Sequence, residues 1–349
     1  MKNKATAALA AMGMVVLILD SKTALRGAQE AITLCLQTVI PVLLPFFVLS
    51  GILSAGLAQI HIPCQGVWSR LLRVPIAAVP MVFVGFLGGY PVGARNVAQA
   101  YHQGHLDKAT SERMLAFCSN AGPAFLFGIG MGLFDSIGIC CLVWGIHILS
   151  ALIVAVLTPC KTTHSAGSST LCALTLPQAL QLALHALANV CGWVVLFRVM
   201  LAIGERWFLW AFSPEMGAIL SGLLELTNGC CQLNQIANMG LRMTLFSGFL
   251  SFGGLCVAMQ TVSVCEGLST AWYLPGKLCQ GAISVLLCIP AQLVFPPEQR
   301  NLCSIPQIVG CCTCCVCYHI YAKRGNLHKL CAIPQYERKK CSISKRVVV

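Results

Sequence analysis

Long apolar stretches follow one another along most of the chain. A helix needs about 20 residues to cross the hydrocarbon core of a membrane, and several of these stretches are close to that length. Their apolar residues are continuous, whereas the strands of a membrane β-barrel alternate apolar and polar residues. The pattern therefore predicts an all-α, polytopic helical membrane protein, whose apolar segments lie at 5–19, 31–58, 76–90, 114–134, 137–158, 179–203, 207–224, 241–262 and 278–296.

The composition excludes most other classes of protein. Of 349 residues, 57% are hydrophobic and 10% are charged, and the mean hydropathy is +0.78. Soluble domains carry about 25% charged residues. A soluble globular protein, a disordered chain and a nucleic-acid binder with a basic face are all excluded. We expect the lipid bilayer and a small-molecule solute as partners, and no nucleic acid; a homo-oligomer stays open.

The positive charge lies mainly at the C-terminal end. From Arg300 onwards there are nine Lys or Arg residues and one acid, against fourteen and ten in the rest of the chain. The positive-inside rule therefore predicts a cytoplasmic C-terminus. Lys2 and Lys4 predict the same for the N-terminus, and hence an even number of crossings. No convincing cleavage site follows the segment 5–19, so we expect an uncleaved first helix rather than a signal peptide.

Eight of the 22 cysteines lie inside these apolar runs, where cysteine behaves as a small hydrophobic residue, and no soluble extracellular domain is indicated for the others. We therefore expect no disulfide framework. The tail holds overlapping Cys-x-x-Cys pairs at 311–317, followed by Cys331 and Cys341. Zinc sites usually separate two such pairs by a dozen or more residues, so a cysteine-rich membrane-associated helix is favoured over a metal site. No metal or cofactor is expected.

The chain divides into two halves of similar pattern around a polar loop at 159–178. Each half holds a glycine-rich run that is followed by an interrupted apolar helix. Asp135 and Ser136 predict a tight hairpin between the runs 114–134 and 137–158. The predicted organisation is a first helix and linker (1–30), a first repeat (31–158), a linker (159–178), a second repeat (179–296) and a Cys-rich basic tail (297–349).

Four interruptions are predicted, at 88–93, 119–123, 225–229 and 251–254. Irregular backbone at membrane depth survives only inside protein or beside a watery cavity. In transporters, half-helices that end at such breaks present their termini to a solute. Ser119 and Asn120 are residue types favoured as N-caps, and Ser251 is the corresponding residue of the second half. The alternative is a set of kinks that serve only packing.

Two charged residues adjoin the interruptions. An acid at membrane depth costs roughly 2.5–3.5 kcal/mol, so Glu225, with Thr227 and Asn228, is a candidate to bind a solute, a proton or a cation. The alternative is a Glu225 that is solvated at the membrane interface. Arg95 is either an anion-binding residue or a loop charge that obeys the positive-inside rule. The stretch 99–113 is expected to be a solvated loop or surface helix.

No catalytic signature is present: the sequence lacks a Walker A loop, an H-E-x-x-H pair and a G-x-S-x-G elbow. We therefore expect no enzyme. Without an ATP-binding domain, transport would be secondary or facilitated, or would need a partner ATPase.

Four motifs in this order resemble one known family. Gly-Tyr-Pro-Val-Gly-Ala-Arg at 89–95, Ser-Asn-Ala-Gly-Pro-Ala-Phe at 119–125, Glu-Leu-Thr-Asn-Gly at 225–229 and Ser-Phe-Gly-Gly at 251–254 are similar to segments of the YlbJ-like sporulation integral membrane proteins. That family belongs with the nucleoside-recognition gate domains, which are related to concentrative nucleoside carriers. The resemblance covers about residues 30–295 and has no counterpart for the tail.

The resemblance implies a membrane carrier for a small anionic metabolite in an endospore-forming bacterium. Its implied role is the movement of dipicolinic acid toward the forespore. The rival interpretations are a nucleoside-type carrier driven by protons or sodium, with Glu225 binding the ion; a non-transporting assembly factor for the spore envelope; and a membrane redox enzyme that uses the tail cysteines. The candidate solute-binding residues are Gly89, Tyr90, Pro91, Gly93, Arg95, Ser119, Asn120, Gly122, Pro123, Glu225, Thr227, Asn228, Gly229, Ser251, Gly253, Gly254 and Gln260.

Overall fold

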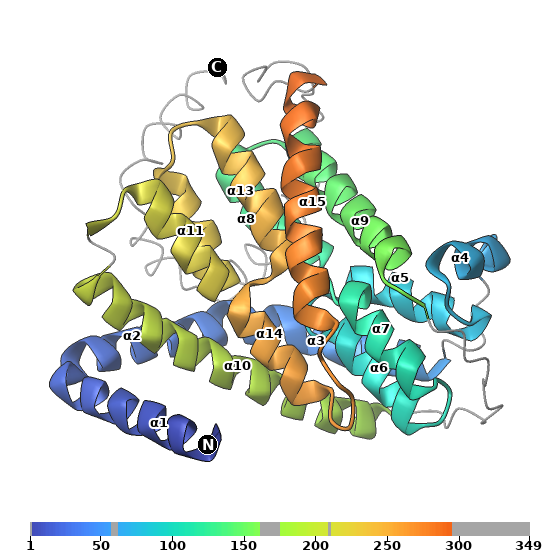
Figure 1. Cartoon of the computed structure of the whole chain (residues 1–349), viewed down its shortest axis with the longest axis horizontal. Coiled ribbons are helices and arrows are strands. Elements are labelled where there is room, and N and C mark those ends of the chain that lie inside the picture. Colours follow the sequence, from blue (N-terminus) through green and yellow to red (C-terminus); the bar gives the residue numbers. More distant parts are fainter. Residues whose placement is uncertain (1, 57–61, 161–174, 209–210, 295–349) are drawn as a thin grey trace, which may run out of the picture. The chain divides into compact units, whose positions relative to one another are not determined.

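The computed structural model describes residues 2–56, 62–160, 175–208 and 211–294. Every regular element in these ranges is a helix, which confirms the predicted all-α class (Figure 1). Five helical segments of the described chain are long and apolar enough to cross a membrane, or six if the bent pair Gln65–Leu72 and Ile76–Gly88 forms one span. The chain is therefore a multi-pass membrane protein. The five candidate spans are Lys108–Phe134, Ile137–Leu157, Leu176–Trp207, Met239–Val264 and Tyr273–Gln292.

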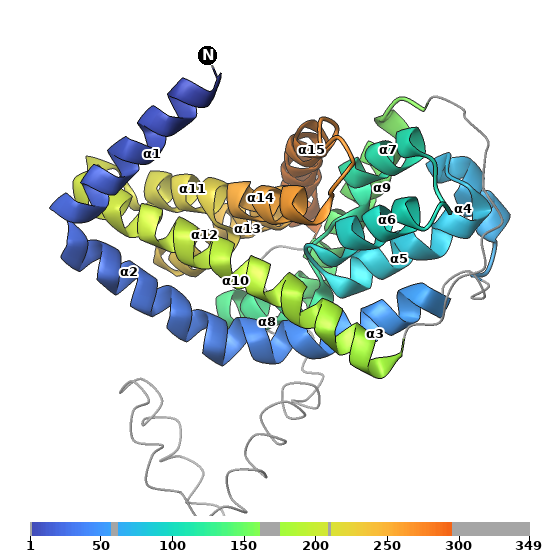
Figure 2. The ribbon, with the colours of Figure 1, turned by 90° about the horizontal axis from the view of Figure 1, so that it is seen from below.

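The longest helix packs against the N-terminal helices. α10 (Leu176–Trp207) runs beside α2 (Ser21–Leu34) and α3 (Ile40–Gly56), which are joined by the π-helical turn η1 (Cys35–Val39). These helices lie side by side in Figure 2, preceded by α1 (Lys2–Leu19). The approach of α2 to α10 is close because Gly27 has no side chain: a Cβ there would lie 2.9 Å from the Cβ of Ala202.

The first half holds the short helix α4 and the turn η3, and then two further short helices, an interrupted helix and an unbroken helix. α5 and α6 pack side by side, α7 and α8 are separated by a break, and α9 returns along them. The predicted hairpin before α9 is confirmed: Asp135 is left-handed, with φ of 49°, and the Ser136 hydroxyl accepts a hydrogen bond from the Ile139 N–H at 3.4 Å. The elements are α4 (Gln65–Leu72), η3 (Ile76–Ala78), α5 (Val79–Gly88), α6 (Val92–His102), α7 (Lys108–Cys118), α8 (Pro123–Phe134) and α9 (Ile137–Leu157).

The α-helices of the second half, from α11 to α15, follow the order of α5 to α9. α11 and α12 form the short pair, α13 and α14 the interrupted helix, and α15 the unbroken one. This order agrees with the internal duplication expected from the sequence, while the domain boundaries given for it stay a prediction. The elements are α11 (Pro214–Leu224), α12 (Leu226–Gln232), η5 (Leu233–Gln235), α13 (Met239–Phe252), α14 (Gly254–Val264) and α15 (Tyr273–Val294).

α15 connects the two halves. It packs against α13 of its own half and against α7 and α9 of the first half. Figure 1 shows α15 upright between α13 and α9. A side chain on the buried face of α15 can therefore contact groups from both halves.

Some predicted segment boundaries are wrong. The run predicted at 207–224 becomes a helix only from Pro214, and the run predicted at 278–296 belongs to a helix that begins at Tyr273. Within the stretch 99–113, predicted to be solvated, Ser111 and Arg113 are buried in α7. The tail from 297 and most of the linker 159–178 lie outside the described residues.

Candidate functional site

The four predicted interruptions are confirmed. Helices end and restart at Gly89–Pro91, at Ser119–Gly122, at Glu225 and at Gly253. The backbone is left-handed in φ at Gly89 (76°) and at Gly253 (86°). Residues with a side chain rarely adopt such values, so glycine is needed at both positions.

The first and second interruptions are packed backbone to backbone. A Cβ added to Gly122 would lie 3.0 Å from the Cα of Gly89, and one added to Gly93 would collide with the carbonyl oxygen of Cys118. The third and fourth interruptions meet similarly, since a Cβ on Gly254 would lie 3.2 Å from the backbone nitrogen of Leu226. Glycine therefore permits the close approach of both pairs.

Tyr90 joins the first interruption to the fourth. Its ring lies 3.1 Å from a Cβ built on Gly253. Its hydroxyl donates to the carbonyl oxygen of Leu250 at 3.0 Å, and the carbonyl oxygen of Ser251 is 3.4 Å away. The peptide bond between Tyr90 and Pro91 is cis. Tyr90 thus joins the first and second interruptions, which pack together, to the fourth.

A fully buried polar cluster lies where these interruptions are joined. The Lys277 ammonium donates to Asn120 Oδ1 at 3.1 Å and to Gln280 Oε1 at 2.7 Å. Gln280 Nε2 donates to Asn120 Oδ1 at 3.0 Å and to the carbonyl oxygen of His147 at 3.3 Å. His147 Nδ1 lies 2.9 Å from Ser251 Oγ. All five residues are 0% exposed, so the cluster is a polar interior within apolar helices. We call Asn120, His147, Ser251, Lys277 and Gln280 the central cluster.

Three buried hydroxyl groups lie close to one another, and two of them, on Ser119 and Tyr273, are near residues of the central cluster in sequence. The Tyr273 hydroxyl lies close to the hydroxyls of Thr261 and Ser119, yet none of the three completes a hydrogen bond of good geometry within the described chain. Tyr273 precedes Lys277 by four positions on α15, so the two side chains share one face of the helix. These hydroxyls are donors available to a ligand.

Glu225 is buried but its carboxylate is already used. Oε1 accepts from the Thr227 N–H at 3.0 Å, and Oε2 accepts from the backbone N–H and the side-chain amide of Asn228 at 2.7 and 2.8 Å. Glu225 is thus the N-cap of α12. The interpretation of a solvated Glu225 at the membrane interface is wrong, since the residue is 3% exposed.

Arg95 and Gln260 lie apart from these hydrogen bonds. Arg95 is on α6 and half-buried, and its guanidinium makes no ion pair or hydrogen bond with the described residues. The interpretation of Arg95 as a loop charge is wrong, because Arg95 lies within helix α6. Gln260 is buried on α14 and donates to Cys256 Sγ at 3.4 Å.

The expected N-cap roles are wrong. Gly122, not Ser119 or Asn120, is the N-cap of α8 and makes no side-chain cap bond; the Asn120 amide donates backwards to the carbonyl oxygen of Phe117 at 2.7 Å. Ser251 lies inside α13, and Gly253 precedes α14. The side chains of Asn120 and Ser251 are therefore directed to the central cluster instead of to helix ends.

The sequence comparison matches part of the chain. The chain is 26% identical over 132 residues to the sporulation integral membrane protein YlbJ of Bacillus subtilis (strain 168), over 37% of this chain and 32% of the relative. The chain is similar to YlbJ. This match confirms the family resemblance predicted from the motifs and agrees with the multi-pass architecture. No family model matches the chain. No solved structure matches it either.

Some residues of the predicted motifs contact residues that are not among the predicted site residues. Of the predicted residues, Tyr90, Asn120 and Ser251 reach the central cluster or its edge, whereas no hydrogen bond links Arg95, Glu225 or Gln260 to it. Lys277, Gln280, His147, Tyr273 and Thr261 were missed. The signal was present: Lys277 and His147 are ionisable residues within apolar helices, the criterion that selected Glu225.

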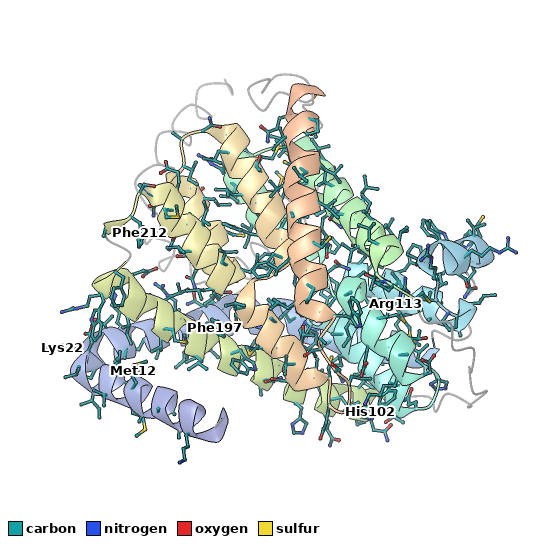
Figure 3. All side chains as sticks on the ribbon, in the orientation of Figure 1. Met12, Lys22, His102, Arg113, Phe197 and Phe212 are labelled. Carbon is teal, nitrogen blue, oxygen red and sulfur yellow. The ribbon has the colours of Figure 1, made fainter. Side chains whose placement is uncertain are left out.

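Two other buried or half-buried arginines have structural roles. Arg113, labelled in Figure 3, donates to the carbonyl oxygens of Leu72 at 2.9 Å and Ala155 at 2.6 Å, and further to those of Arg73 and Thr158. Arg242 donates to the carbonyl oxygens of Ile236 and Leu133. Carbonyls at the ends of helices lack intrahelical partners, and both arginines satisfy such groups.

Proposed function

We propose that the chain is a membrane carrier, rather than an enzyme, for a small polar or anionic metabolite. The observation that supports this is the meeting of three helix interruptions around the central cluster. Burying so many polar groups among apolar helices is costly unless they have partners or a use. Interrupted helices that face a polar interior are the arrangement that secondary transporters use to hold a solute.

The cargo we propose is dipicolinic acid, moved toward the forespore. Two observations support this choice. The similar protein from Bacillus subtilis is an integral membrane protein of sporulation, and Lys277 offers an ammonium group to an anion. The carrier would lie in the cell membrane, including that of the forespore.

The alternatives receive less support. A cation-driven nucleoside carrier with Glu225 as the ion ligand is disfavoured, because both oxygens of that carboxylate cap α12. A non-transporting assembly factor has no need of a buried cluster of five polar residues. A redox role for the tail cysteines falls on residues outside the described chain, and no group of three or more metal-ligating residues occurs among the described ones.

Uptake into proteoliposomes tests the proposal. The purified full chain should accumulate labelled dipicolinate above liposomes without protein. Asn120→Ala removes the acceptor shared by Lys277 and Gln280 and should lower uptake at least roughly tenfold, as expected for loss of charge-assisted hydrogen bonds. The control is Asn234→Ala, since Asn234 is exposed in η5.

Two results would contradict the proposal. One is uptake of dipicolinate, small carboxylates and nucleosides that never exceeds the background of liposomes without protein. The other is an Asn120→Ala protein that inserts normally and transports at the rate of the wild type.

A further inference from the structure

Lys277 has no acidic partner among the residues that the structure describes. Its ammonium group is fully buried on α15 and is bonded to the neutral oxygens of Asn120 and Gln280. The ring of Tyr90 lies 5.3 Å from its Nζ. Within the described chain, Lys277 makes no ion pair, while Glu225, the acid among the predicted site residues, is occupied in the cap of α12.

The other described groups that face Lys277 supply no negative charge. His147 faces it from α9 and Cys118 from α7, and Tyr90 faces it from the first interruption. Tyr273 lies one turn away on α15 itself. α13, which also packs against α15, brings the hydroxyls of Ser247 and Ser251 to this face and no described acid. The surroundings are therefore neutral when His147 is neutral.

A lone ammonium in such surroundings is unfavourable. Removing a charge from water without a counter-ion costs so much that the group tends to lose its proton or acquire an anion. Lysine, unlike arginine, can take either course, because its amine can be deprotonated in a protein. The neutral amine of Lys277 therefore suits a site without an anion, and the ammonium form suits a site with an anion bound.

Donors beside Lys277 favour a carboxylate as that anion. The hydroxyls of Ser119, Thr261 and Tyr273 are buried and lack good hydrogen-bond partners. A carboxylate accepts several hydrogen bonds and donates none, so an ammonium with neighbouring hydroxyls satisfies it, whereas a nucleoside brings no negative charge.

We propose that Lys277 couples transport to protons, by taking up one proton when a carboxylate of the cargo binds and releasing it when that carboxylate leaves. This inference rests on the proposed carrier function. The bond formed is N–H at Nζ of the neutral amine, with the proton taken from water on the side of binding. On the other side the same N–H bond breaks and the proton returns to water. One negative charge of the cargo is thereby neutralised during each crossing.

The experiment measures uptake of labelled dipicolinate into proteoliposomes, with and without an inward proton gradient and with the membrane potential clamped to zero. In the wild type the gradient should raise the initial rate several-fold. Lys277→Met should lower uptake by roughly 10- to 100-fold, through loss of a charge-assisted contact. Lys277→Arg keeps the charge but cannot release a proton, so its residual uptake should not respond to the gradient.

Lys108→Met is the matched control, because Lys108 is exposed at the start of α7. It should retain both the rate and the gradient response of the wild type. Equal wild-type rates with and without the gradient would overturn the inference, as would a Lys277→Met rate within twofold of wild type; both leave the carrier proposal standing. Wild-type uptake at background would overturn the carrier proposal itself, and the coupling with it. The wild-type comparison does not depend on the folding of any variant.

Discussion

At the residue scale, glycine determines where the helices of this protein can be interrupted. Gly85 and Gly93 both face the carbonyl oxygen of Cys118, where a Cβ on either would collide with it. Gly89 and Gly253 are left-handed in φ. The sequence predicts these interruptions because glycine and proline cluster there. It does not reveal which groups the interruptions bring together, since that depends on contacts between residues more than a hundred positions apart.

Gly93→Ala should destabilise the protein. The added Cβ would meet the carbonyl oxygen of Cys118 in backbone that cannot shift easily, and overpacking of this kind costs about 1–3 kcal/mol. The measurement is the apparent melting temperature of the purified protein in detergent.

Gly145→Ala is the control for that substitution. Gly145 is exposed on α9 and has no atom within 4 Å of an added Cβ. Alanine favours helix over glycine by about 1 kcal/mol, so this variant should be as stable as the wild type or more so. A lower melting temperature for Gly145→Ala than for Gly93→Ala would show that the packing at Cys118 is not limiting.

Of two buried charged residues, the sequence predicts the burial of Glu225 but not that of Lys277. The sequence identifies Glu225 as a buried acid but not as a helix cap, because the N–H groups of Thr227 and Asn228 become available only when α11 ends at Leu224. The sequence does not point to Lys277, because the predicted apolar run begins only at residue 278. In the structure, the turn before 278 is helical and carries Lys277 inward.

At the scale of elements, buried arginines link helices that do not follow one another in sequence. Arg113 on α7 donates to carbonyl oxygens at the end of α4 and at the end of α9. The stretch 99–113 reads as a solvated surface because it is polar. Arg113 is nevertheless 4% exposed, and its donors are satisfied entirely by backbone. Sequence alone could not show those acceptors.

Arg113→Met should lower stability by about 3 kcal/mol or more, since four carbonyl oxygens lose a charged donor. The check is again the melting temperature in detergent, together with the yield of protein that inserts in the membrane. Arg70→Met, an exposed position on α4, should change neither quantity. If both variants melt at the same temperature, the hydrogen bonds of Arg113 contribute nothing net.

At the scale of the whole molecule, the halves share one order of α-helices, α5 to α9 and α11 to α15, and meet through α15 and Tyr90. The all-α class and the hairpin at Asp135 followed from the apolar pattern. The central placement of α15 did not, because the pattern of one segment contains no information about its neighbours. Among the described residues, the number of candidate spans is five, or six if the bent pair around Val74 counts as one span.

The charge distribution predicts that both termini face the cytoplasm. Reporter enzymes that are active on one side of the membrane only, fused in turn to each terminus, would measure this. Both fusions should report the cytoplasmic side, since Lys and Arg cluster at both ends. Termini on opposite sides would mean an odd number of crossings, which would contradict the prediction.

The meeting of Tyr90, Asn120 and Lys277 has a consequence for capacity. Two of these residues come from the first half and one from the second, so neither half contains a complete binding environment. Although the order of helices is similar in the two halves, the proposed carrier function would therefore give each polypeptide one cargo site.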